Sequence, residues 1–263
     1  MIRNNKFEFF IRAIQIFLNP RSPAAVYKNP YPFFAQIFTR SLNKVIKMIK
    51  DGSMCNICGR MGKFGLNAAI SINSISRNDI CLTCYSNKRT RTLAYYFKNF
   101  LLNVNFPLNI LDIGPLESTR LFFRNFDYKY LTLDKFRKTD FCDDITNMKS
   151  IPDMKMDYVL CLHVLEHIPN DFQAMKEIKR VLRINGSAFI MVRQITGLKK
   201  TNKNNISPFN GYGHIWSYGF DFEERLIKAG FKVKILRPKE IFDKNDFKKY
   251  GLCDDLIYSC ESN

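Results

Sequence analysis

The chain has little glycine, proline, tryptophan or histidine, and each shortage excludes something. Its 263 residues contain 12 Gly, 10 Pro, one Trp and three His. So little glycine and proline excludes collagen-like and low-complexity proteins. No apolar run reaches the roughly 18 residues of a transmembrane helix, and polar residues interrupt the first positions, unlike a secretory signal peptide. We therefore expect a cytoplasmic protein without a transmembrane segment.

Acidic residues are also scarce, with 24 Asp and Glu against 41 Lys and Arg, which gives a formal net charge of +17. Hydrophobic residues make up 46% of the chain, which is enough for a core and excludes wholesale disorder. A surface this basic attracts polyanions, so nucleic acid, an anionic membrane surface or acidic metabolites are candidate partners. Composition alone does not choose among them.

Residues 1–50 form a separate basic and aromatic segment, with nine Lys or Arg and a single acidic residue, Glu8. Apolar side chains recur in it at helical spacing in two groups: Phe7, Phe10, Ile11 and Ile14, then Phe34, Phe38, Leu42, Val45 and Ile49. The pattern predicts two helices packed on the body of the protein. The alternative is an interfacial helix that holds the protein peripherally on an anionic membrane.

Four of the eight cysteines form two Cys-x-x-Cys pairs, Cys55 with Cys58 and Cys81 with Cys84, separated by 22 residues. Each pair aims two thiolates at one point, and two pairs complete a tetrahedral four-sulfur shell. The spacing predicts a structural Zn²⁺ in a module over residues 51–90, with no ligand position left open. The alternatives are coincidence or a redox pair, which needs only one Cys-x-x-Cys.

A basic run, residues 88–91, follows the second pair and reads as the start of a helix to about Leu102. Positive side chains oppose the helix dipole there. They therefore indicate either contacts to a partner or substrate phosphate, or simply a solvated face.

From Pro107 onward, apolar strands alternate with helices. The strands are expected at 108–114, 128–134, 156–162, 187–192, 231–236 and 255–260, and the helices at 171–182 and 222–229. This order predicts a buried, mostly parallel sheet with helices on both faces. Ligands of such sheets bind at the carboxyl ends of the strands.

Polar residues gather at those strand ends. Asp112 and Asp134 end the first two strands, and a carboxylate about 20 residues after the first turn is where a nucleoside ribose is held. His163 and His167 follow the next strand. His214 lies beyond a long polar loop, residues 193–212, which is either a substrate lid or a surface insertion.

The segments LDIG, LTLD, DDIT and HVLEH, in this order, resemble a class I methyltransferase that uses S-adenosylmethionine. With CNICG and CLTC ahead of them, the chain resembles a subgroup that has an N-terminal four-cysteine zinc module. The resemblance covers about residues 52–260. It implies a Rossmann-like sheet of seven strands with an antiparallel last strand, in a catalytic domain over residues 91–263.

The resemblance also implies roles for single residues. Asp112 would lie near the amino group of the methionine moiety, Gly114 would let the backbone pass close to the cofactor, and Asp134 would accept both ribose hydroxyls. Asp144 and Ile145 would border the adenine, and Leu162 and His163 would line the pocket next to the methyl sulfonium. In this chain Pro115 follows Gly114 and the family's second glycine is missing, so the loop is stiffer than usual.

The expected activity is methyl transfer to an unidentified acceptor. Three residues at the cleft edge are the main candidates for the catalytic proton transfer: Glu166, His167 and His214. His163 is an alternative to His167 as the base, and Glu166 would orient or replace whichever histidine acts. Glu166 and His167 have a structural alternative, since they would also suit the start of a helix. Two other functions stay open, a zinc-ribbon protein that binds nucleic acid, RNA above all, and a degenerate, non-catalytic scaffold.

Overall fold

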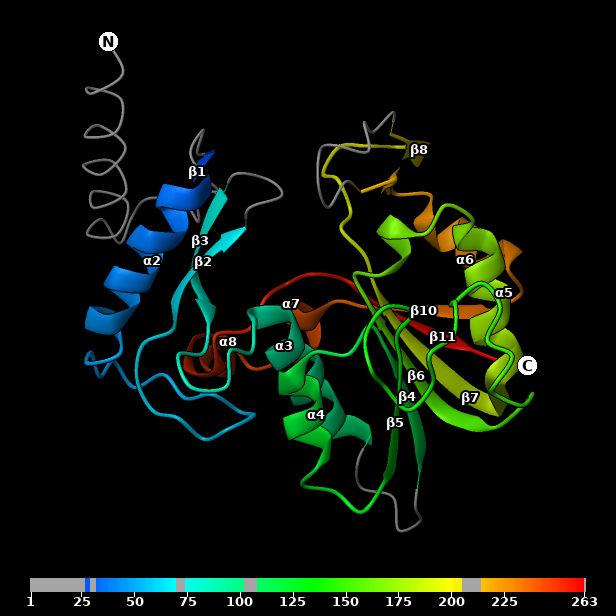
Figure 1. The fold of residues 1–263 in the computed structure, drawn as a ribbon, viewed down its shortest axis with the longest axis horizontal. Helices are drawn as coiled ribbons and strands as arrows, with labels where there is room; N and C mark the ends of the chain where they lie inside the picture. The colour runs from blue at the N-terminus through cyan, green and yellow to red at the C-terminus, as the bar shows by residue number, and fades with distance from the viewer. Residues whose placement is uncertain (1–26, 29–31, 70–73, 102–107, 205–213, 263) are drawn as a thin grey trace. The chain divides into compact units, whose positions relative to one another are not determined.

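The computed structural model describes residues 27–28, 32–69, 74–101, 108–204 and 214–262. The chain divides into two compact units (Figure 1). Unit 1 comprises Met1–Arg91 and Asn245–Leu252, and unit 2 comprises Thr92–Lys244 and Cys253–Asn263. The three-part division expected from the sequence, residues 1–50, 51–90 and 91–263, stays a prediction.

Unit 2 contains a six-stranded mixed sheet in the order β10-β11-β7-β6-β4-β5. Its strands are β4 (Asn109–Ile113), β5 (Lys129–Leu133), β6 (Met156–Leu162), β7 (Leu182–Met191), β10 (Lys232–Leu236) and β11 (Ile257–Glu261). The strands β5, β4, β6 and β7 are parallel, and β11 runs antiparallel to both of its neighbours. The carboxyl ends of β4, β5 and β6 therefore lie at one edge of the sheet.

The alternation of side chains along the strands divides the core between the two faces of the sheet. Ala188 and Ile190 of β7 join the apolar cluster that includes α5 (Asp171–Val181) and α6 (Phe222–Lys228). Phe189, between them, packs instead on Phe97. Phe97 in turn contacts Phe123 of α4 (Glu117–Phe123). Helices consequently cover both faces, with α4 and α5 on opposite sides (Figure 1).

The predicted fold class is confirmed: a Rossmann-like α/β sheet, helices on both faces, and an antiparallel last strand. Among the described residues, the main sheet of unit 2 has six strands and not the expected seven, because the segment after β5 pairs with it only through the single bridge Leu133–Phe141. Asp140 accepts hydrogen bonds from the backbone and the hydroxyl of Thr132, which ties this segment into turns. The predicted bounds of β6 agree residue for residue, whereas β7 begins five residues earlier than predicted.

Other helices differ from expectation. The helix predicted to reach Leu102 consists of α3 (Lys88–Tyr96) followed by the π-helix η2 (Phe97–Leu101). The sequence did not predict α4, α7 (Pro238–Ile241) or α8 (Lys244–Tyr250). The short strands β8 (Asn202–Lys203) and β9 (Trp216–Ser217) were also unexpected. The short 3₁₀ helix η3 (Leu165–His167) contains Glu166 and His167, for which a helix start was the structural alternative.

Unit 1 contains a three-stranded antiparallel sheet and the helix α2 (Pro32–Ile46). Its strands are β1 (Tyr27–Lys28), β2 (Gly65–Ala69) and β3 (Ser74–Ile80). The second helix expected in residues 1–50 corresponds to α2, but Ile46 is buried where Val45 was expected to pack, and Val45 is exposed. The first expected helix, from Phe7, lies outside the described residues.

The positive charge of the chain is concentrated in unit 1. Its residues include 17 Lys and Arg against 4 Asp and Glu, a formal charge of +13, whereas unit 2 carries +4. Arg40 and Lys44 of α2 are exposed, and so is Lys47, which follows the helix. Across the described ranges, no helix is long and apolar enough to cross a membrane. A polyanionic partner for residues 1–50 stays a prediction.

Candidate functional site

The sulfur atoms of Cys55, Cys58, Cys81 and Cys84 all lie within 4.8 Å of one another. The closest contacts join the two pairs: 3.6 Å from Cys55 Sγ to Cys84 Sγ, and 3.6 Å from Cys58 Sγ to Cys81 Sγ. A tetrahedral zinc site with Zn–S bonds of about 2.3 Å has S–S edges of roughly 3.8 Å, whereas a disulfide needs about 2.0 Å. The donor set and its spacing fit Zn²⁺, and no two of these sulfurs lie at the distance of a disulfide.

The two knuckles repeat one backbone geometry. In each, the N–H of the first Cys donates to the carbonyl five residues later, and its own carbonyl accepts from the N–H four residues later, at 2.8–3.0 Å. The residue at that fourth position is left-handed, Gly59 with φ 72° and Tyr85 with φ 56°. A non-glycine residue such as Tyr85 is strained in this conformation. The second knuckle therefore brings its sulfurs together at the cost of local backbone strain.

The close packing of the four sulfurs shifts the thiol pKa values in opposite directions. The Cys55 thiolate accepts hydrogen bonds from Cys81 and Cys84, which hold its pKa far below the usual range. Burial raises the pKa of Cys58 to about 11. A cation at the centre would replace these shared protons and favour four thiolates.

Arg91, which the sequence placed in a basic helix start, is fully buried. Its guanidinium donates to four backbone carbonyls, those of Asp79, Ser86, Tyr250 and Gly251, and lies 3.8 Å from the ring centre of Phe64. The expectation of a solvated or phosphate-binding role is therefore wrong for Arg91. It supports the second cysteine knuckle through the Ser86 carbonyl, which also accepts from Cys81.

Asp112 of β4 is 2% exposed, and its carboxylate accepts a hydrogen bond of 2.5 Å from the Tyr130 hydroxyl. Burial raises the pKa of Asp112 to about 6, although Tyr130 and Thr119 act in the opposite direction. Sequence reasoning missed Tyr130. The parallel register sets Ile110 beside Tyr130, so Asp112 and Tyr130 project from the same face, a relation that only the register reveals.

We expect Asp112→Asn to stabilise unit 2 at neutral pH. The amide still accepts from Tyr130, while the buried charge is removed. A folded pKa of about 6 against 3.8 for the free group corresponds to roughly 3 kcal/mol at most. This cost exists above pH 6 and vanishes below pH 4, so the variant's gain in unfolding free energy, about 1–3 kcal/mol, should disappear on acidification. Denaturant unfolding of the parent and the variant, above pH 6 and below pH 4, measures this gain in unfolding free energy. An equal gain under both conditions would contradict the burial argument.

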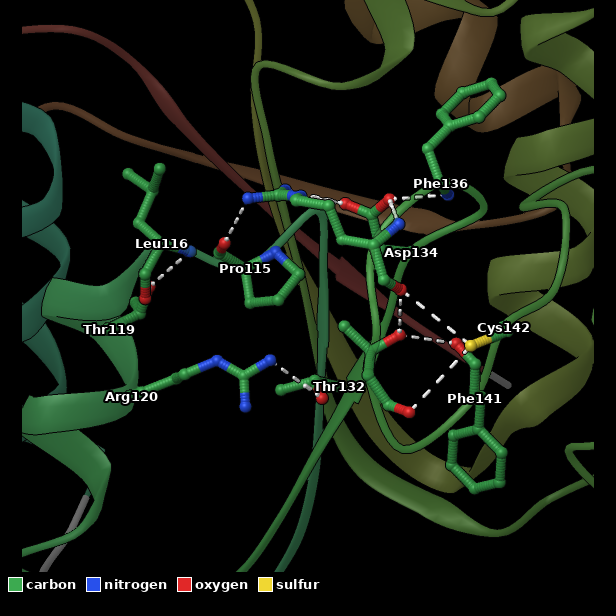
Figure 2. Close-up of polar contacts among 11 residues, drawn as sticks. Pro115, Leu116, Thr119, Arg120, Thr132, Asp134, Phe136, Phe141 and Cys142 are labelled. Carbon is green, nitrogen blue, oxygen red and sulfur yellow. Dashed lines mark hydrogen bonds and ion pairs between the residues drawn. The ribbon is translucent and has the colours of Figure 1, made fainter.

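Asp134 follows the carboxyl end of β5, close to Pro115 and Phe136 (Figure 2). Its Oδ1 accepts from the backbone N–H groups of Phe136 (2.8 Å) and Arg137 (3.0 Å), and its Oδ2 accepts from Arg137 Nε (2.7 Å). Burial acts to raise the pKa of Asp134, but these bonds outweigh it and hold the pKa below its usual value. The carboxylate is therefore ionised and fixed at the strand end.

Gly114 has φ 66°, and its N–H donates to the carbonyl of Leu133 at 2.9 Å. The left-handed conformation favours glycine, and a Cβ at this position would lie a tight 3.0 Å from Val164 Cγ2. The close passage of this backbone to a cofactor stays a prediction. Beyond Gly114, Pro115 and Leu116 lead directly into α4.

The expected adenine border is close to the turn after Asp134. Asp144 pairs with Lys135 at 2.8 Å and accepts from the backbone and hydroxyl of Thr146. The Lys135 bond, followed by those from Thr146, lowers the pKa of Asp144 to about 2. Ile145 is 5% exposed and joins the core, whereas Leu162, the last residue of β6, is only partly buried.

The turn after β6 holds a buried acid–histidine pair. Glu166 is fully buried, and its Oε1 accepts from the Arg193 N–H (2.5 Å) and from His163 Nδ1 (3.0 Å). His163 has a left-handed backbone, φ 57°, strain of a kind that clusters at functional sites. Although burial acts to raise it, the pKa of Glu166 is lowered by the bonds from His163 and the Arg193 N–H.

An ionised carboxylate only accepts hydrogen bonds, so the ring proton of neutral His163 lies on Nδ1 and Nε2 carries the lone pair. No hydrogen-bond partner of His163 Nε2 or of Glu166 Oε2 is found in the part of the chain that the structure describes, and both atoms are buried. This arrangement is a proton acceptor held in one tautomer and oriented by a carboxylate. The sequence left His163 and His167 open as the histidine that Glu166 orients, and the structure pairs Glu166 with His163.

The other two histidines lie together, with ring centres 4.8 Å apart for His167 and His214. The Ile215 N–H donates to the Glu166 carbonyl, and Trp216 Nε1 donates to the carbonyl of Ile168. Burial lowers the pKa of His214. His163 thus bonds Glu166, while His167 contacts His214; that the three histidines line the edge of a cleft stays a prediction. The expected lid stays a prediction, because residues 205–213 lie outside the described ranges.

Comparisons with known proteins give a limited match. The family model described as a methyltransferase domain matches residues 125–190, and no curated protein matches the chain. Among solved structures, the chain is similar to the Burkholderia thailandensis 1,6-didemethyltoxoflavin-N1-methyltransferase (14% identity, TM-score 0.47, 66% of this chain and 78% of that one). It is also similar to an Archaeoglobus fulgidus SAM-dependent methyltransferase (15% identity, TM-score 0.44, 65% of this chain and 92% of that one). A third similar structure is the [4+2]-cyclase SpnF (15% identity, TM-score 0.48, 90% of this chain and 99% of that one).

The family match covers 66 of 263 residues, from the residues before β5 to β7. It includes Asp134, His163 and Glu166, but neither Asp112 nor the four clustered cysteines. A shared fold does not fix an activity. A functional assignment therefore depends on the geometry of the site itself.

Proposed function

We propose that unit 2 transfers a methyl group from S-adenosylmethionine to an acceptor that is deprotonated by His163. The observation that carries this proposal is the buried Glu166–His163 pair at the carboxyl end of β6, with His163 Nε2 unpaired within the described residues. The family match over residues 125–190 supports the reaction class.

The residues at the strand ends fit the cofactor. Asp134 would accept the ribose hydroxyls, Gly114 gives close access to the backbone, and Asp112 with Tyr130 would border the methionine end. When bound, S-adenosylmethionine supplies a methyl group on a positively charged sulfur, already activated for displacement. The zinc held by the four cysteines would be structural, because four thiolates leave no open coordination position.

The chain's own contribution to the chemistry is alignment and proton acceptance. His163 Nε2 would accept the proton of an oxygen or nitrogen nucleophile as that atom attacks the methyl carbon. Glu166 would stabilise the resulting imidazolium through Nδ1, as a carboxylate does when it orients a catalytic histidine. His167 and His214 would line the acceptor side of the same site.

The cofactor assignment predicts a binding defect in Asp134→Ala. Hydrogen bonds to a charged acceptor are worth about 1.5–3 kcal/mol, and about 1.4 kcal/mol is one decade of affinity. The variant should therefore bind S-adenosylhomocysteine at least about 10-fold more weakly by calorimetry. Asp153→Ala, an exposed carboxylate paired with Arg180, is the control and should bind like the parent. Equal binding by all three proteins would place the site elsewhere.

A further inference from the structure

The carboxylate assigned to the ribose is already saturated by its own chain. Besides the two backbone N–H groups on Oδ1, the guanidinium of Arg137 approaches Oδ2 with two nitrogens, Nε at 2.7 Å and Nη2 at 2.6 Å. A carboxylate offers about four lone-pair sites. Asp134 therefore has no acceptor site left for a ribose hydroxyl in this conformation.

Arg137 also reaches the neighbouring strand end. Its Nη1 donates to the Pro115 carbonyl at 3.2 Å, in the loop that follows β4. Because β4 and β5 are parallel neighbours with Ile113 beside Leu133, the guanidinium spans the carboxyl ends of two adjacent strands. This is the place where a nucleoside would lie across the sheet edge.

The two partners differ in their freedom to move. The Arg137 side chain is 58% exposed, whereas that of Asp134 is 11% exposed and is fixed by backbone N–H groups. An ion pair this exposed is a weak interaction. A ligand with two hydroxyl donors can replace it, and the arginine can move into solvent while the carboxylate stays in position.

We propose that Arg137 lowers the affinity for the cofactor by occupying the Asp134 carboxylate in the ligand-free chain. The ribose must then displace the guanidinium in order to bind. This inference rests on the proposed function, because it takes Asp134 as the ribose acceptor. The contact acts as a competitor supplied by the chain itself. Its removal should strengthen cofactor binding, which is the opposite of what removing a ligand-binding residue does.

The experiment is calorimetric titration of S-adenosylhomocysteine into the full-length, zinc-loaded protein and three variants. Arg137→Ala should bind about 3- to 10-fold more tightly than the parent. Arg137→Lys should lie between them, because an ammonium lacks the two-pronged geometry of the guanidinium. Lys138→Ala removes the same charge from the exposed neighbouring residue and should match the parent. The difference in affinity between the parent and Arg137→Ala should become smaller at high salt, since salt screens an exposed ion pair.

The outcomes separate this inference from the proposed function. If the parent binds and Arg137→Ala binds equally or more weakly, with an unchanged melting temperature, the competing role of Arg137 is overturned. If Arg137→Ala has a lower melting temperature and Arg137→Lys does not, the binding of Arg137→Lys decides. Tighter binding than the parent supports the inference, and binding equal to the parent overturns it. If neither the parent nor any variant binds, the proposed function itself fails.

Discussion

Glu166→Gln should lower methyl transfer by roughly 10²- to 10⁴-fold and leave the affinity for S-adenosylhomocysteine nearly unchanged. Glutamine keeps the shape of the side chain and still accepts from the Arg193 N–H and from His163. It lacks the negative charge that stabilises a protonated His163. An interaction made mainly in the transition state is lost from turnover and not from ground-state binding. The assay follows labelled methyl groups into the acceptor that a screen identifies.

His163→Gln should show a loss of similar size, because Glu166 acts through this ring. His167→Gln is the matched comparison: His167 is exposed and contacts His214 instead of Glu166, so its loss should be about 10-fold or less. A large loss in His167→Gln with full turnover in Glu166→Gln would assign the base to the other histidine pair. Melting temperatures of all three variants check that folding is retained.

Cys81→Ser should release zinc and destabilise unit 1. Structural zinc sites contribute about 10–16 kcal/mol of binding free energy that is also folding free energy, and a serine hydroxyl is a poor replacement for a thiolate. Metal analysis should give about one zinc per parent chain and much less in the variant. Unit 1 should lose its thermal transition, while unit 2 should keep its affinity for S-adenosylhomocysteine.

Cys142→Ser is the control for this prediction, because Cys142 is an exposed thiol of unit 2 and not one of the four clustered sulfurs. It should retain zinc and melt like the parent. A parent without zinc, or a Cys81→Ser protein with full zinc and an unchanged melting temperature, would contradict the metal centre.

The features that the sequence predicted well are local in the chain. The Cys-x-x-Cys spacing specifies a knuckle within six residues, and the two knuckles indeed share one hydrogen-bond pattern. Strand β6 is apolar apart from Asp157 and is buried along most of its length, so its bounds could be predicted directly. Asp112, Asp134 and His163 were placed at strand ends because parallel strands end at a common edge.

The features that the sequence missed depend on register or on backbone conformation. The sequence left His163 and His167 open as partners of Glu166. The bond to His163 forms with that residue in a left-handed backbone conformation, which no local pattern predicts. The Arg193 N–H reaches Glu166 from the end of β7, 27 residues away. Arg91 was expected in a solvated or phosphate-binding basic run. Its guanidinium instead donates to four backbone carbonyls, and two of these belong to residues 250 and 251, far away in the sequence.

The most direct test of the central claim, that the strand ends of unit 2 bind S-adenosylmethionine, is calorimetric titration of S-adenosylhomocysteine into the folded, zinc-loaded parent protein. The account predicts saturable binding at one molecule per chain and a rise in the melting temperature of unit 2, because a ligand that binds only the folded state stabilises it. Folded protein that gives no saturable heat and no shift in melting temperature would contradict the account and favour a non-catalytic scaffold.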